Sequence, residues 1–179
     1  MNFPAHKHRT TRGRSRFTIF RHKDAKLVSD TGLMIYRWSD QMLAGSDKLS
    51  EAGISDGSVT KELFCHAGDS GFSLVHTWFK SNYHLPRHRH NVDCLYYVIS
   101  GSVLLGNQVL RGGDGFFVPR DHAYTYRAGQ DGAEVLEFRD ATSFDIELDE
   151  KPAVFDRILQ SVHENHDNWT SEIEPPSRR

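Results

Sequence analysis

The chain has 179 residues, enough for one domain with a single core and too few for two domains of ordinary size. Hydrophobic residues make up 37% and charged residues 26%, with 14 glycines, so the composition excludes a disordered or fibrous chain. The formal net charge of -2 argues against a nucleic-acid binder with a strongly basic surface.

The first segment, residues 1–16, carries five Lys/Arg and no acid. A flexible, solvated arm is favoured there over an arm that binds phosphates. No apolar run approaches the ~20 residues of a membrane span, and the N-terminus has no apolar stretch typical of a secretion signal. The only cysteines are Cys65 and Cys94, which make no disulfide framework. We therefore expect a cytoplasmic protein without a membrane or nucleic-acid partner.

Residues 17–60 alternate short apolar runs with polar stretches, and residues 44–58 indicate a loop with at most a short helical turn. From about residue 60 the pattern changes to short runs rich in Val, Phe, Tyr and Leu. The expected strands are 59–66, 72–79, 94–101, 102–106, 108–112, 115–119, 123–128 and 133–138. Gly, Asn and Asp separate many of them, as at Gly106-Asn107 and in residues 128–132. This spacing, without helices in between, predicts an all-β antiparallel sandwich or barrel.

After Pro152 the period of the apolar residues changes. Phe155, Ile158, Leu159 and Val162 stand at helical spacing, and proline suits the first turn of a helix. The sequence therefore divides into a basic arm (1–16), a β-barrel (17–150) and a C-terminal helix with a tail (151–179).

Candidate metal ligands concentrate in residues 84–101 of this histidine-rich chain. His88 and His90 are two residues apart, so on a strand both imidazoles project to the same face. Two neutral imidazoles on one strand form half of a site for Fe, Mn, Ni, Cu or Zn. A basic, solvent-facing strand is the alternative, because Arg87 and Arg89 lie among the histidines.

The stretch resembles the first motif of the cupin superfamily. His88 and His90 fill its histidine positions, Gly101 fits the closing glycine, and Asn82 stands at the opening glycine. Residues 113–119, from Gly113 to Pro119, reproduce the start of the second cupin motif at the expected spacing. The resemblance covers about residues 60–140. It implies a cupin double-stranded β-helix, a jelly-roll barrel, with an N-terminal extension and a C-terminal helix.

The site departs from the family pattern at two ligand positions. Cys94 stands at the glutamate of the first motif, and Tyr124 stands at the histidine of the second. His122, two residues before Tyr124, has the same strand parity, and His84 could also lean inward. The expected metal ligands are therefore His88 and His90, with His122 or Cys94, and His84 as a further alternative.

Cys94 has a second interpretation as a small buried hydrophobe. Cysteine dioxygenases resemble this chain in having a cysteine at the same motif position, where it can crosslink to a tyrosine near the iron. They keep the histidine of the second motif, which this chain lacks unless His122 replaces it. Cys94 and Tyr124 are accordingly the expected catalytic residues.

The candidate substrate-binding residues are Tyr96, Phe117, Tyr126 and Arg120, and Arg87, Arg89 or Arg127 could also pair with a carboxylate. The resemblance implies one divalent metal, with Fe expected ahead of Ni, Mn, Zn or Cu. It implies action on a small aromatic, carboxylate or keto molecule, with oxygenation ahead of isomerisation, decarboxylation or lyase chemistry. The alternative function is a cupin that has lost its metal and binds a small ligand without catalysis. Small cupins commonly pair, so we expect a homodimer.

Overall fold

The computed structural model describes residues 17–37, 39–67, 71–149 and 151–179. The basic arm expected at 1–16 lies outside the described residues. The strands are β1 (Lys26–Leu27), β2 (Met34–Arg37), β3 (Ser58–His66), β4 (Phe72–Phe79), β5 (His88–His90), β6 (Cys94–Leu105), β7 (Gln108–Arg111), β8 (Gly115–Val118), β9 (Arg127–Arg139) and β10 (Phe144–Leu148). The helices are α1 (Asp40–Glu51) and α2 (Pro152–Ser171), with 3-10 turns η1 (His22–Asp24), η2 (Val28–Asp30), η3 (Ile54–Gly57) and η4 (Pro176–Arg178).

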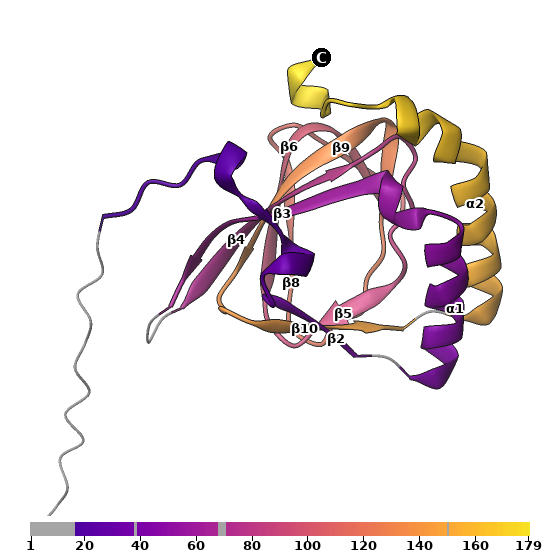
Figure 1. Cartoon of the computed structure of the whole chain (residues 1–179), viewed down its shortest axis with the longest axis horizontal. Coiled ribbons are helices and arrows are strands. Elements are labelled where there is room, and N and C mark those ends of the chain that lie inside the picture. Colours follow the sequence, from indigo (N-terminus) through magenta and orange to yellow (C-terminus); the bar gives the residue numbers. More distant parts are fainter. Residues whose placement is uncertain (1–16, 38, 68–70, 150) are drawn as a thin grey trace, which may run out of the picture.

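Two sheets face each other around a common interior (Figure 1). The larger has seven strands in the order β1-β3-β4-β9-β6-β7, with β8 also paired to β6. The smaller has the order β2-β10-β5, in which β10 runs antiparallel to β5 and parallel to β2. This arrangement confirms the all-β prediction and places the histidine strand β5 in the smaller sheet, opposite the long strands β6 and β9.

Alternating burial along β6 shows which side chains enter this interior. Cys94, Tyr96 and Val98 are buried, whereas Leu95 and Tyr97 between them are exposed on the outer face. This is the period-2 pattern of a strand with one face on the core. The inward positions of the neighbouring strands are thereby set by their pairing with β6.

Two predicted boundaries are wrong around β9. Residues 128–132, expected to form a turn, lie inside β9, where the pairing with β6 shifts register and Gly132 has φ of +81°. The strand expected at 123–128 shrinks to an isolated bridge between Tyr124 and His88, whose backbone groups exchange hydrogen bonds of 3.0 and 2.9 Å. Tyr124 is thus held against the histidine strand by its own main chain.

The predicted loop at 44–58 is also wrong in large part, because α1 spans Asp40–Glu51. The Ser39 hydroxyl accepts a hydrogen bond from the Met42 N–H and caps the helix at its start. Met42 and Leu49 are buried against the core. Tertiary packing therefore stabilises a helix whose own sequence is mostly polar.

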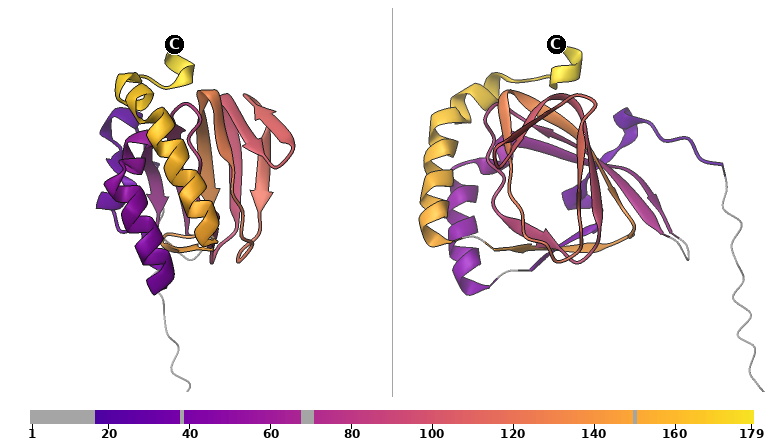
Figure 2. Two further views of the ribbon diagram at one scale, coloured as in Figure 1. Left: turned by 90° about the vertical axis from the view of Figure 1, so that its right-hand side faces the viewer. Right: turned by 180° about the vertical axis from the view of Figure 1, so that it is seen from behind.

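The C-terminal helix is confirmed as α2, and it lies beside α1 on one side of the sheets (Figure 2). Phe155, Ile158 and Val162 are buried as the helical spacing predicts, and Leu159 is partly buried. The two helices approach closely at Gly45, where an added Cβ would stand 2.8 Å from the Phe155 ring.

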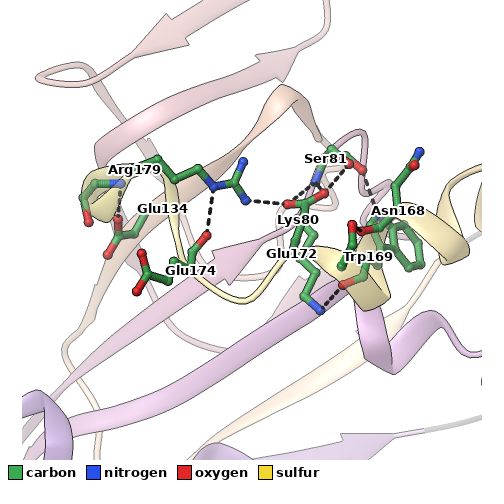
Figure 3. A network of polar contacts seen from close by, with 10 residues as sticks. Lys80, Ser81, Glu134, Asn168, Trp169, Glu172, Glu174 and Arg179 are labelled. Carbon is green, nitrogen blue, oxygen red and sulfur yellow. Dashed lines mark hydrogen bonds and ion pairs between the residues drawn. The ribbon is translucent and has the colours of Figure 1, made fainter.

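Polar contacts attach the end of α2 to the turn after β4 (Figure 3). The Lys80 ammonium donates to the Trp169 carbonyl at 2.7 Å, and the Trp169 indole N–H donates to the Ser81 carbonyl at 2.8 Å. The Ser81 hydroxyl donates to the Glu172 carboxylate, which also accepts from Arg179. The chain segment that leads to β5 is therefore tied to the C-terminal helix. In the described ranges, no helix is long and apolar enough to cross a membrane.

Candidate functional site

A cavity of about 610 Å³ lies between the two sheets. Its apolar wall includes Met34, Phe79, Tyr83, Leu85, Ile146 and Leu148. Its polar groups include His88 and His90 of β5, Tyr96 of β6, Glu137 and Arg139 of β9, and Tyr126 just before β9. A mostly apolar cavity with a few convergent polar groups is the usual form of a small-molecule site.

His88 and His90 are both buried and point to the same side of β5, with ring centroids 5.0 Å apart. The Nδ1 of His88 lies 2.8 Å from the Pro86 carbonyl, and the Nδ1 of His90 lies 2.7 Å from the Asp145 carbonyl. A carbonyl oxygen only accepts, so each Nδ1 carries the proton and each neutral ring has its lone pair on Nε2.

Burial lowers the pKa of both rings. The pKa of His88 falls from 6.5 to about 4, through desolvation. The pKa of His90 falls to about 2, through desolvation and then through the positive charge of Arg139. Both imidazoles are therefore neutral near pH 7 and act as hydrogen-bond acceptors at Nε2.

A chain of hydroxyl groups connects His88 to the cavity. The Tyr124 hydroxyl lies 2.9 Å from the His88 Nε2, and it must donate there because that nitrogen has no proton. Tyr124 also contacts the Tyr96 hydroxyl, which consequently donates to Tyr124. Burial raises the pKa of both tyrosines, so both are protonated at neutral pH.

Arg139 and Glu137 form a buried ion pair at the same end of the cavity. The Arg139 Nη2 donates to the Glu137 carboxylate at 2.6 Å, and the Thr77 hydroxyl donates to its other oxygen at 2.8 Å. The same Nη2 lies 3.4 Å from both the His90 Nε2 and the Tyr96 hydroxyl. Burial opposes the charge of the guanidinium, but Glu137 beside it raises the pKa of Arg139 above its usual value.

The guanidinium also has unused hydrogen-bonding capacity. Arg139 is 2% exposed, with its charge 4.2 Å from the centre of the Phe144 ring. Among the described residues, its Nε and Nη1 have no hydrogen-bond partner. Buried donors without acceptors are uncommon and costly, which indicates that an acceptor from a ligand or from water belongs there.

Cys94 lies next to this polar group in the interior, 1% exposed. Burial raises the pKa of its thiol to about 12, so the side chain is a neutral thiol. Cys94 and Tyr124 are therefore close to the site, packed behind the residues that line the cavity.

Three predicted site residues lie elsewhere. His122 is exposed in the turn after Pro119. Phe117 pairs with Leu95 on the outer face of the larger sheet, and Arg120 lies near two surface carboxylates, 3.5 Å from Asp93 and 3.9 Å from Asp140. The positive φ of Asp121, 62°, bends the chain between Pro119 and His122, so the strand parity that predicted an inward His122 does not hold. Of the predicted substrate-binding residues, Tyr96 and Tyr126 do line the cavity.

The remaining arginine candidates also point away from the cavity. Arg87 pairs with Asp149 and Arg89 with Glu147 at the surface, and Arg127 and His84 line a separate surface pocket. Sequence reasoning instead missed Glu137 and Arg139. A signal was available, because Val135, Glu137 and Arg139 alternate along one strand and the charged pair therefore shares the inward face of Val135.

The side chains around His88 and His90 decide whether the site suits the divalent metal that the motifs imply. Within the described residues, no group of three or more His, Cys, Asp or Glu side chains is placed to hold a metal ion. His88 and His90 present suitable Nε2 lone pairs, but one accepts from Tyr124 and the other faces the Arg139 guanidinium. Cys94 is packed behind the residues that line the cavity, and Glu137 is paired with Arg139. The residues as arranged do not fit a divalent cation.

Comparison with known proteins found no matching family model, and no curated protein matches the sequence. The similar solved structures include KdgF from Halomonas sp., with 22% identity and a TM-score of 0.42 over 48% of this chain and 80% of that one. They include the polyketide cyclase RemF from Streptomyces resistomycificus, with 18% identity and a TM-score of 0.39 over 46% of this chain and 64% of that one. An RmlC-like cupin protein from Ralstonia eutropha has 11% identity and a TM-score of 0.48 over 69% and 68%. These structures are similar to this chain over part of its length, and the likeness concerns the fold alone.

Proposed function

We propose that the protein binds a small, partly apolar organic molecule with a carboxylate or carbonyl oxygen in the cavity between the sheets. The apolar wall of Phe79, Leu85 and Ile146 suits the hydrocarbon or aromatic part of such a molecule. The polar groups at His88, His90 and Arg139 suit its oxygen atoms. This function corresponds to the alternative expected from the sequence, a protein that has lost its metal and binds a small ligand.

The observation that carries the proposal is the buried guanidinium of Arg139. Two of its nitrogens are buried without an acceptor among the described residues, and the Arg139 side chain lies at the cavity wall. A ligand oxygen that accepts from one of these nitrogens makes a charge-assisted hydrogen bond in a site of low dielectric constant. Ligands with an oxygen acceptor should therefore bind better than purely apolar ones.

The hydroxyl chain supplies a route for a proton. Tyr96 lines the cavity, donates to Tyr124, and Tyr124 donates to the His88 Nε2. A proton released by a bound carboxylic acid to the Tyr96 oxygen can move through both hydroxyls and end on His88, whose pKa of about 4 suits such an acid. The negative charge that remains on the ligand is then stabilised by Arg139. Isomerisation or another proton-transfer reaction is the chemistry that this arrangement supports.

Ile146 provides a direct test of the cavity, because it lines the cavity and Ile35 in the same sheet does not. Isothermal titration with benzoate and with phenylpyruvate should show binding to the wild type. Ile146→Phe should weaken that binding at least tenfold by filling the space. Ile35→Phe is the matched control, since Ile35 is exposed on β2, and it should bind as the wild type does. Failure of both probes to bind, or equal effects of the two substitutions, would contradict the proposal.

The metal-dependent, oxygenase-type reaction is the second candidate function. It is favoured by the Nε2 lone pairs of His88 and His90. Backbone carbonyls bound to the Nδ1 atoms orient both rings, as is usual for metal-bound histidines. It requires Arg139 to leave the position it has here. Iron analysis of untagged protein and oxygen consumption with the same probes test it, and iron that stays in His90→Ala would contradict this site.

A further inference from the structure

We propose that the Arg139 guanidinium is the resident cation of this cavity and occupies the place where His88, His90 and Glu137 would otherwise bind a divalent metal. The inference deepens the proposed function, because it identifies the cation that faces the ligand oxygen. Only the statement that a ligand oxygen faces this cation rests on the proposed function. The arrangement of charges in the protein is independent of it.

One nitrogen, Nη2, makes the contacts that support this inference. It lies 2.6 Å from the Glu137 Oε2, 3.4 Å from the His90 Nε2 and 3.4 Å from the Tyr96 hydroxyl. A carboxylate oxygen and an imidazole lone pair are ordinary metal ligands, and here both are directed at a nitrogen that carries part of a positive charge. The His88 ring centroid is 5.0 Å from that of His90 on the same strand, so a third donor lies nearby.

The charge balance favours the guanidinium over a metal. Arg139 and Glu137 form a buried pair of one positive and one negative charge, so the pair carries no net charge. A divalent ion beside the guanidinium would add two positive charges with no further carboxylate to compensate them. Such an excess is costly in an interior of low dielectric constant. The metal and the guanidinium therefore exclude one another.

The ligand atoms nevertheless stay prepared for a metal. The Pro86 and Asp145 carbonyls fix the Nδ1 protons of His88 and His90, and those contacts do not involve Arg139. Thr77 holds one oxygen of Glu137 in the same way. Removing the guanidinium should consequently leave the His90 Nε2 and the Glu137 carboxylate around a space that has lost its cation, with the His88 Nε2 available once the Tyr124 hydroxyl turns away from it.

The test is a gain of metal binding in Arg139→Met, measured with Co²⁺ alone on untagged protein. Titration followed by visible absorption and calorimetry should show no binding by the wild type. Arg139→Met should bind one Co²⁺ per chain, with a rise in melting temperature on addition of the metal. His90→Ala in the Arg139→Met background should abolish both changes.

Arg89→Met is the matched control, because Arg89 lies on β5 between the two histidines and forms an exposed ion pair with Glu147. It should bind no Co²⁺. Arg139→Gln serves as a second neutral variant, and if either Arg139 variant is unfolded without metal, refolding on addition of Co²⁺ supports the inference. Stoichiometric Co²⁺ on the wild type that depends on His90, or no Co²⁺ on both neutral variants, overturns it.

The outcome is separate from that of the proposed function. Suppose that the wild type binds neither benzoate nor phenylpyruvate and that Arg139→Met binds Co²⁺. This result would contradict the proposed ligand binding and would support Arg139 as the resident cation. Binding of the organic probes together with His90-dependent Co²⁺ binding by the wild type would do the reverse.

Discussion

At the scale of single residues, burial decides the chemical state of the site. His88 and His90 are neutral, Cys94 is a protonated thiol, and Arg139 keeps its charge because Glu137 lies beside it. The sequence predicted the two histidines from their spacing and from the resemblance of the stretch to the first cupin motif. It could not predict their partners, because Tyr124 and Arg139 reach them from distant parts of the chain.

The stability of the fold should depend on pH through His88. The ordinary pKa of a histidine is 6.5, and burial lowers the pKa of His88 to about 4 in the folded protein, so between these pH values the unfolded chain binds a proton that the folded chain does not. The free energy of unfolding therefore falls as pH is lowered through this window. The loss for this one group is about 2 kcal/mol between pH 7 and pH 5. Urea denaturation at both pH values measures it.

His88→Gln should lose about 2 kcal/mol less than the wild type over the same pH interval, because glutamine does not titrate. His163→Gln, at an exposed position on α2, is the control and should lose as much as the wild type. Equal pH dependence of all three proteins would show that His88 binds its proton equally well in both states.

The buried ion pair gives a second prediction at this scale. Glu137→Gln leaves the Arg139 guanidinium buried without its carboxylate, and we expect a loss of about 3 to 5 kcal/mol in the free energy of unfolding. Glu147→Gln breaks the exposed pair with Arg89 and should change stability little. Similar urea midpoints for the two variants would contradict the role assigned to burial.

At the scale of elements, prediction from sequence succeeded where one pattern dominates and failed where packing does. The strands around residues 59–66 and 72–79 were predicted from runs of strand-forming residues and the helix after Pro152 from its helical spacing, and the structure has all three. Helix α1 was missed because its sequence is polar and its stability comes from Met42 and Leu49 against the core. An inward His122 was predicted from strand parity, which the turn at Asp121 interrupts.

Gly57 shows how closely the elements approach at η3. An added Cβ would stand 2.4 Å from the Tyr83 ring and 2.9 Å from the Trp169 ring. We expect Gly57→Ala to lower the free energy of unfolding by about 1 to 3 kcal/mol, because both rings must move. Ser55→Ala, exposed on the same turn, is the control and should remain near the wild type in a thermal melt. An unchanged melting temperature for Gly57→Ala would contradict the close packing.

At the scale of the whole molecule, the two motifs that resemble those of cupins predicted the fold, but the residues around the cavity could be assigned only from the structure. His90, Tyr96 and Arg139 come from β5, β6 and β9, and their meeting depends on how two sheets face each other. A single sequence records which residues alternate along a strand, and it does not record the register between strands. The alternation of Glu137 and Arg139 along β9 could therefore be read from the sequence, but their place beside His90 and Tyr96 could not.

The homodimer stays a prediction, and the outer face of the larger sheet suggests where two copies would meet. Leu95, Phe117 and Phe138 are paired across β8, β6 and β9 and are 52%, 59% and 41% exposed. Exposed apolar patches commonly mark protein interfaces. Light scattering at micromolar concentration should give the mass of two chains, and Phe117→Glu should give the mass of one.

Val109→Glu is the control for that experiment, since Val109 is exposed on β7 outside the row of three. It should remain a dimer. A wild-type monomer would contradict the homodimer, and a dimer that tolerates Phe117→Glu would contradict this face.

The attachment of α2 to the turn before β5 has a consequence for how the molecule responds to occupancy. Ser81 and Asn82, which precede the histidine strand, are held by Trp169, Glu172 and Asn165 of the C-terminal region. Any ligand that steadies this turn should also slow the exchange of amide hydrogens in the last turns of α2. Deuterium uptake at the C-terminal end of α2 would then report binding in the cavity between the two sheets.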